Sequence, residues 1–114
     1  MDARLPTKMW VSARLNQWNA AGDPAVLRRR GDPDGGTVII IVDRCDGHAV
    51  LLGQRRDLDG KLFWEPLGTG DAMGLEDQAS YLERALKRDR DVWLVAVDVT
   101  DGWPPLHEPV ITKP

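Results

Sequence analysis

Residues 37–67 read TVIIIVDRCDGHAVLLGQRRDLDGKLFWEPL, and this stretch decides the fold. Its three apolar runs are separated by Asp46-Gly47 and Asp59-Gly60. An Asp-Gly pair between apolar runs is typical of a β-hairpin, because the tight turn needs positive φ angles that glycine adopts easily. The first run is apolar and β-branched without a break, which is typical of a central strand covered on both faces. The stretch therefore predicts three antiparallel strands, over residues 37–42, 48–56 and 61–67.

The flanking sequence adds two further strands and two helices. A short strand over 25–30 extends the hairpins to a meander of four strands, and a helix over 7–21 precedes it. A second helix spans 75–88, and its apolar residues recur at steps of four, three and four on one face. These residues are Leu75, Ala79, Leu82 and Leu86. A last strand over 92–99 is apolar on both faces, and two prolines after Trp103 predict that residues 103–114 are irregular.

The order α-β-β-β-β-α-β predicts an α+β protein with a largely antiparallel sheet and both helices packed on one face. A chain of 114 residues has room for one domain, so residues 1–114 are expected to fold as a single unit. Hydrophobic residues make up 42% of the chain and charged residues 29%, a balance typical of globular rather than disordered proteins.

Cysteine content and charge exclude several classes of protein. Cys45 is the single cysteine, so an internal disulfide is excluded and a reducing compartment is favoured. Residues 1–6 carry an acid and a proline where a secretion signal would be apolar, and the longest apolar run is too short to span a bilayer. We therefore expect a cytoplasmic protein with no membrane contact. The net charge of −3 does not favour nucleic-acid binding.

Six short pieces of the chain have a distinctive order and spacing, although each piece alone is unremarkable. They are Trp10-Val11, Asn19-Ala20-Ala21-Gly22, Arg29-Arg30-Gly31-Asp32, Asp46-Gly47, Asp91-Val92-Trp93-Leu94-Val95 and Glu108-Pro109. Together they resemble a small family found in alphaproteobacteria and classed only as a domain of unknown function, DUF1491. The resemblance covers roughly residues 2–111. It implies a bacterial, non-secreted, single-domain protein, and it carries over no catalytic or binding residue.

The residues that could form a metal site or a nucleophile are too few. Cys45 and His48 have the spacing of half a zinc site, but a structural zinc needs four ligands and the distant candidates are only His107 and Glu108. Aspartates stand on either side of Cys45, and their charges should raise the pKa of its thiol and so disfavour the thiolate nucleophile. We expect no catalytic residue, no metal site and no cofactor.

The loop before the second helix suggests an alternative function. Three residues match the first half of the signature of Nudix hydrolases, which cleave nucleoside diphosphate derivatives: Gly70, Glu76 and Arg84. That chemistry needs several helix carboxylates to hold divalent cations. Ala85 and Arg88 occupy positions where the family has glutamates, which leaves only Asp89. The alternative is therefore a degenerate Nudix-like or phosphate-ligand-binding domain that uses residues 68–76 and the following helix.

Tryptophan and arginine side chains are the candidate contacts for a partner protein, because both residue types carry much of the binding energy at interfaces. Trp103 follows a turn glycine and is the best candidate for an exposed ring, unless it folds back over the edge of the sheet. Trp64 alternates with Phe63, so one of these two rings can face solvent.

Arginines of the first and third strands would lie one strand apart on one face of the predicted meander: Arg28, Arg30 and Arg55. Their other explanation is protection of an edge strand against aggregation. From these residues and the two tryptophans, the sequence predicts a non-catalytic protein-binding or adaptor module, and it leaves the oligomeric state open.

Overall fold

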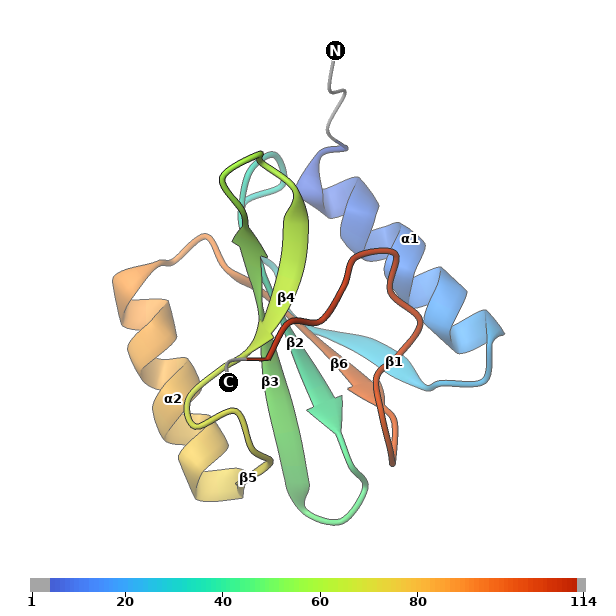
Figure 1. The fold of residues 1–114 in the computed structure, drawn as a ribbon, viewed down its shortest axis with the longest axis vertical. Coiled ribbons are helices and arrows are strands. Elements are labelled where there is room, and N and C mark those ends of the chain that lie inside the picture. The colour runs from blue at the N-terminus through green and yellow to red at the C-terminus, as the bar shows by residue number, and fades with distance from the viewer. Residues whose placement is uncertain (1–4, 113–114) are drawn as a thin grey trace.

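The structure is a computed structural model that describes residues 5–112, which form two helices and six strands (Figure 1). The helices are α1 (Thr7–Ala20) and α2 (Leu75–Arg88). The strands are β1 (Ala25–Arg29), β2 (Val38–Asp43), β3 (His48–Arg56), β4 (Leu62–Pro66), β5 (Met73–Gly74) and β6 (Trp93–Asp98). The predicted class and order of elements are confirmed, and only the two-residue β5 was not predicted. Within residues 5–112, neither helix is long and apolar enough to cross a membrane.

The strands are ordered β1-β6-β2-β3-β4 across the sheet, and β5 pairs with β3. The predicted hairpins between β2, β3 and β4 are confirmed as antiparallel pairs. However, β6 lies between β1 and β2, parallel to β2 and antiparallel to β1. The predicted four-strand meander was therefore wrong in pairing β1 with β2. The reason is burial: β2 and β6 are apolar on both faces, and such strands are best covered when they are neighbours in the middle of the sheet.

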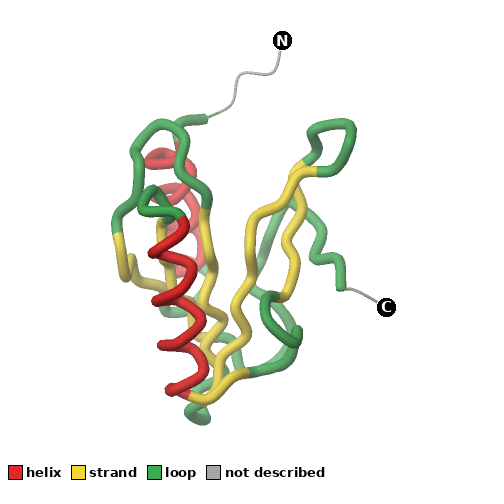
Figure 2. Tube along the Cα trace, turned by 90° about the vertical axis from the view of Figure 1, so that its left-hand side faces the viewer, coloured by secondary structure: helices red, strands yellow, loops and turns green. Residues whose placement is uncertain are grey.

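The two helices cover opposite faces of the sheet, whereas the sequence predicted both on one face. In Figure 1 the strands run between α1 and α2, and in Figure 2 α2 is nearest the viewer with α1 behind. Val11 and Trp18 of α1 pack in one core cluster, while Tyr81 and Leu86 of α2 pack against the other. Side chains of a strand alternate between faces, so strands that are apolar at every position need a cover on each side.

Helix α2 contacts the sheet with only the second half of the predicted stripe. The side chains that pack on the sheet are Tyr81, Leu82, Ala85 and Leu86. Leu75 is instead 73% exposed, and Ala79 is also exposed. Met73 of β5 fills the position next to the core that Leu75 was expected to fill. Leu82 and Leu86 are therefore confirmed, but the contacts with the sheet begin six residues after Leu75, at Tyr81.

At each edge of the sheet, hydrogen bonds occupy the outward backbone groups of one residue. At β1, Asn19 Nδ2 donates to the Ala25 carbonyl (3.0 Å) and Asn19 Oδ1 accepts from the Ala25 N–H (2.9 Å). At β4, the Trp64 N–H donates to the Pro109 carbonyl (2.9 Å) and the Ile111 N–H donates to the Trp64 carbonyl (2.8 Å). The C-terminal segment thus runs beside β4, and these contacts occupy backbone groups that would otherwise pair with another chain.

Candidate functional site

The arginines predicted to form one basic patch lie far apart. Arg28 belongs to β1 and Arg30 follows it, at one edge of the sheet, whereas Arg55 is in β3. Because β6 and β2 lie between β1 and β3, three strand spacings of about 4.8 Å, or about 14 Å, separate the two groups. The predicted patch assumed that β1 and β3 both flank β2. It is wrong because β6 occupies the place next to β2 that the meander gave to β1.

Each of these arginines has different surroundings. Arg28 is exposed on the edge strand. The Arg30 guanidinium lies 5.8 Å from the centroid of the Trp93 ring. Arg55 Nε lies 3.7 Å from Glu65 Oε2 on the neighbouring strand. Arg28 and Arg30 therefore fit the alternative explanation, the protection of an edge strand by charged side chains.

Trp64 was predicted as a possible contact for a partner, but its side chain is 0% exposed. It belongs to the cluster under α1, where its ring centroid lies 5.5 Å from that of Trp10. Its indole Nε1 donates to Glu108 Oε1 (3.0 Å). The alternation along β4 turns Trp64 toward α1 and leaves Phe63 half-buried on the opposite side, so Trp64 offers no surface for binding.

Trp103 is 37% exposed, so the ring is partly accessible, between the two alternatives that the sequence left open. The Arg44 guanidinium lies 5.2 Å from the centroid of the Trp103 ring, a cation–π contact. Arg44 Nη1 also donates to the carbonyls of Val99 (3.1 Å) and Gly102 (2.6 Å). These bonds fix the guanidinium, and the guanidinium in turn holds one face of the indole. Sequence reasoning missed Arg44, because nothing in the local pattern links it to a loop 59 residues later.

Acidic side chains stand at the ends of β2 and β6, next to Arg44 in the chain. Asp43 and Asp98 are neighbours in the register of the parallel strands β2 and β6. Their carboxylate oxygens and the Cys45 Sγ lie within 4.8 Å of one another, the one such group of three possible metal ligands found within residues 5–112. Partial desolvation at the turn raises the pKa of the Cys45 thiol, and the charges of Asp98, Asp43 and Asp46 raise it further. The thiol is therefore protonated at neutral pH and is a poor nucleophile, as the sequence indicated.

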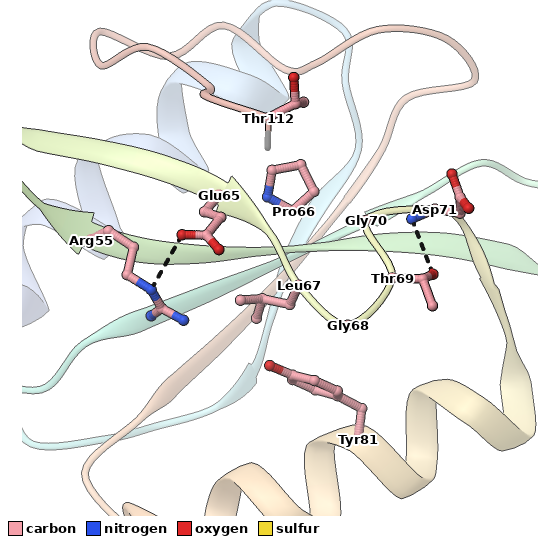
Figure 3. A pocket seen from close by; sticks show the side chains of 10 residues that line it. All are labelled: Arg55, Glu65, Pro66, Leu67, Gly68, Thr69, Gly70, Asp71, Tyr81 and Thr112. Carbon is pink, nitrogen blue, oxygen red and sulfur yellow. Dashed lines mark hydrogen bonds and ion pairs between the residues drawn. The ribbon is translucent and has the colours of Figure 1, made fainter. Parts of the chain in front are cut away.

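A groove lies between α2 and the sheet, next to the loop that the alternative function would use. Its first hollow has a volume of about 390 Å³. Figure 3 shows the Tyr81 phenol reaching from α2 toward Leu67, with Arg55 and Glu65 to one side and the loop with Thr69 and Asp71 to the other. Gly68 and Gly70 in this loop have positive φ angles of 66° and 88°. A second hollow of about 260 Å³ continues under α2 and shares Arg55, Leu67 and Tyr81 with the first.

The acids of α2 are not arranged for a metal-dependent hydrolase. Glu76 lies in the first turn of the helix, and Asp89 follows its last residue. At 1.5 Å per residue, the 13 positions between them correspond to roughly 20 Å, too far for one cation to bind both. Both side chains are also exposed. The geometry therefore does not support a cation clamp built on Glu76 and Asp89.

Two helices on opposite faces of a mixed sheet, with hydrogen bonds occupying part of each edge and a groove under the second helix, define a small three-layer α+β protein. The family model described as "Protein of unknown function (DUF1491)" matches residues 5–107, and the chain belongs to this family. The resemblance seen in the sequence is thereby confirmed.

Solved structures similar to this chain include the following three. The crystal structure of a DUF1491 family protein from Caulobacter crescentus is 34% identical, with a TM-score of 0.82 and coverage of 95% of this chain and 100% of the other. An NMR structure of a DUF1491 family protein from the same species is 34% identical, with a TM-score of 0.79 and coverage of 94% and 96%. A protein from A. tumefaciens shares the fold at 24% identity, with a TM-score of 0.79 and coverage of 97% and 98%. Among proteins with curated descriptions, none matches the chain.

Proposed function

We propose that this chain is a non-catalytic protein-binding module that recognises a basic segment of its partner. The binding site is the Trp103 surface, which consists of Trp103, Arg44, Asp43, Asp98 and Asp101. The observation that carries the proposal is the contact of 5.2 Å between a fixed arginine and a partly exposed tryptophan beside clustered aspartates.

The tryptophan–arginine pair has the composition and rigidity of a binding hot spot. Trp and Arg are enriched among the few residues that dominate binding energy at protein interfaces. Arg44 is fixed by two carbonyl groups and itself packs on Trp103, so neither side chain has much freedom left to lose when a partner binds. A low entropy cost of this kind increases affinity.

The charge of the surface favours a basic partner. Asp43 and Asp98 stand side by side in the register, and like charges on neighbouring strands repel one another. Asp101, whose Oδ1 accepts from the Gly102 N–H, adds a third carboxylate against the single charge of Arg44. Lysine or arginine side chains of a partner would relieve this repulsion and would speed association at low salt.

The proposal is tested by fluorescence anisotropy with two labelled peptides of equal length, one rich in Lys and Arg and one rich in Asp and Glu. We expect the basic peptide to bind and the acidic peptide not to bind. Trp103→Ala should weaken binding by at least about tenfold, and higher salt should weaken it further.

Leu58→Ala is the matched control, because Leu58 is fully exposed at the turn between β3 and β4 and is not part of the Trp103 surface. It should leave the affinity unchanged. Affinity purification with mass spectrometry should then recover the same partner with wild type and Leu58→Ala and lose it with Trp103→Ala. Equal binding of both peptides, or equal losses in both variants, would contradict the proposal.

A further inference from the structure

We infer that the surface between α1 and the outer edge of β4 binds an extended, proline-containing segment of a partner protein. Residues 104–111 of this chain occupy that surface in the structure, and we name them the strap. In Figure 1 the strap, coloured red, passes beside α1 and then runs along β4. The surface beneath it, which we name the strap site, consists of Trp18 of α1 and of Leu62 and Trp64 of β4. None of these residues belongs to the Trp103 surface, so the inference does not depend on the function proposed above.

The strap lies on the strap site as a bound extended peptide would. Its even-numbered residues face the protein: Pro104 is buried, and Leu106, Glu108 and Val110 are half-buried. The odd-numbered residues between them are exposed. Leu106 and Val110 pack against the core cluster under α1. A repeat of two residues is the period of an extended chain, and sites that recognise extended peptides use pockets for alternate side chains in this way.

Two tryptophans of the strap site bind polar groups of the strap. Trp18 Nε1 donates to the Pro105 carbonyl (2.7 Å), and Trp64 Nε1 donates to Glu108 Oε1 (3.0 Å). Surfaces lined by aromatic side chains are typical of sites that bind proline-rich segments, because such segments are already extended before they bind and lose little entropy. The contacts therefore select a segment in which an acidic residue follows a proline by three positions.

The strap leaves part of the strap site unused, so a partner segment can replace it. Its backbone bonds to β4 run from the Trp64 N–H to the Pro109 carbonyl and from the Ile111 N–H to the Trp64 carbonyl. Because hydrogen bonds alternate along an antiparallel pair, the backbone groups of Leu62 point outward like those of Trp64. Within residues 5–112 the strap does not bond these Leu62 groups, and three of its eight residues are prolines without an N–H donor. A partner segment that also bonds Leu62 would bind more tightly than the strap.

A peptide-binding experiment tests the inference. The peptide PPLHEPVI reproduces the strap and carries no Lys or Arg, so it is not the basic segment expected at the Trp103 surface. Leu106→Ser removes an apolar contact of the strap and leaves the residues of the strap site unchanged. In fluorescence anisotropy, the labelled peptide should bind Leu106→Ser at least about tenfold more tightly than wild type, because the strap of wild type competes for the same site.

His107→Ser is the matched control, because His107 is the next residue of the strap and its side chain is exposed. It should bind the peptide as weakly as wild type does, and a peptide of the same composition in scrambled order should bind none of the three proteins. The inference is overturned if Leu106→Ser binds the peptide no better than His107→Ser, or if the scrambled peptide binds equally well. A wild-type dimer formed by exchange of straps, measured by sedimentation velocity, would also overturn it, because the occupant would then be a second copy of the chain.

A second measurement uses wild type alone, so it does not depend on whether Leu106→Ser folds. The indole N–H groups of Trp18 and Trp64 are bound to the strap, whereas that of Trp93 donates to the Asp32 carbonyl (2.7 Å) in the loop before β2. All three rings are buried. Because the strap should open before the rest of the fold, the Trp18 and Trp64 indole groups should exchange with deuterated solvent at least about tenfold faster than the Trp93 group in ¹⁵N spectra. Equal rates would show that the strap opens only with the whole fold, and would overturn the inference.

Discussion

The two faces of the sheet are covered by helices of 14 residues each, but the two covers differ in packing. On the α1 face, Trp18, Trp64 and Trp93 are all buried and fill the space between helix and strands. On the α2 face, the buried side chains are aliphatic, and Tyr81 is only half-buried at the boundary with the helix. A buried tryptophan covers far more area than an aliphatic side chain, so the core under α1 is the more densely filled of the two. A hollow of about 640 Å³ beside Thr7 and Trp10 is confined to the first turn of α1, whereas the hollows on the α2 face continue under that helix.

The difference indicates a division of roles between the faces. Several core side chains on the α2 side are small, including Ala49 and Ala96 in the sheet and Ala85 in the helix, and Ala85 lines the smaller hollow. A filled face contributes most of the packing energy, since loss of contacts in a close-packed core is costly. The looser face contributes less to stability and has room for a ligand. The following predictions test this comparison, starting with the largest expected effect.

The first prediction compares the two helices by truncation. Trp18→Ala should lower the free energy of unfolding by about 3–5 kcal/mol, because it leaves a cavity and removes the hydrogen bond from Trp18 Nε1 to the Pro105 carbonyl (2.7 Å). Leu86→Ala, in the half-buried stripe of α2, should cost less than about 2 kcal/mol. Urea denaturation followed by circular dichroism measures both values. Equal losses would show that the two faces are packed alike.

The second prediction compares glycines on the two sides of the sheet. Gly36 lies on the α1 side, where its carbonyl accepts from Thr7 Oγ1 (2.8 Å), and an added Cβ would collide with the backbone oxygen of Asp91. Gly36→Ala should therefore destabilise the protein by about 2–3 kcal/mol. Gly53→Ala meets only the end of the Leu67 side chain, which can move into the groove, so about 1 kcal/mol is expected. Thermal unfolding tests the order, and a larger loss for Gly53→Ala would contradict it.

The third prediction concerns local opening in the native state. Amides of α2 should exchange with solvent at least about tenfold faster than amides at matching positions of α1, because α2 makes fewer buried contacts. Hydrogen exchange followed by NMR measures both helices in one sample. Similar exchange rates in the two helices would contradict the prediction that the two faces are packed differently.

The fourth prediction changes a charge at the strand ends and should leave the packing of both helices on the sheet unchanged. Asp98 raises the pKa of the Cys45 thiol, so Asp98→Asn should lower that pKa and increase the thiolate fraction at pH 8. Alkylation of Cys45 by iodoacetamide should then be several-fold faster, and the thermal midpoint should not fall, because the change also removes the repulsion between Asp98 and Asp43. Asp59→Asn, at the turn between β3 and β4, serves as a control and should alter neither value. An unchanged alkylation rate in Asp98→Asn would show that this carboxylate does not act on the thiol.

The helices and strands were predictable from the sequence because each depends on neighbours along the chain. The Asp-Gly pairs located the hairpins, and Gly47 and Gly60 indeed have φ angles of 88° and 80°. The unbroken apolar run of β2 indicated a strand covered on both faces, and its residues from Val38 to Val42 are buried. The prediction that both helices lie on one face was wrong because strands covered on both faces need a helix on each side of the sheet.

The candidate sites were predictable only in part. The position of Trp103 between a turn and two prolines left its exposure open. Its contact with Arg44 depends on how the loop after β6 folds back toward the end of β2. Trp64 was misjudged because alternation along β4 gives two faces without saying which of them is covered. The groove had no sequence signal beyond the glycines of the 68–71 loop, since its walls come from β2, β3, β4 and α2.

The sequence by itself determined which segments become helices or strands and where the chain turns, because periodicity and turn chemistry act over a few residues. Tertiary structure alone decided the order of strands, the face that each helix covers, and the side chains that meet at the Trp103 surface and in the groove. These depend on pairings such as Val38 with Trp93, which lie 55 positions apart in the chain. The physical reason is that such pairings form where both faces of β2 and β6 can be buried at once, and burial is a property of the whole fold.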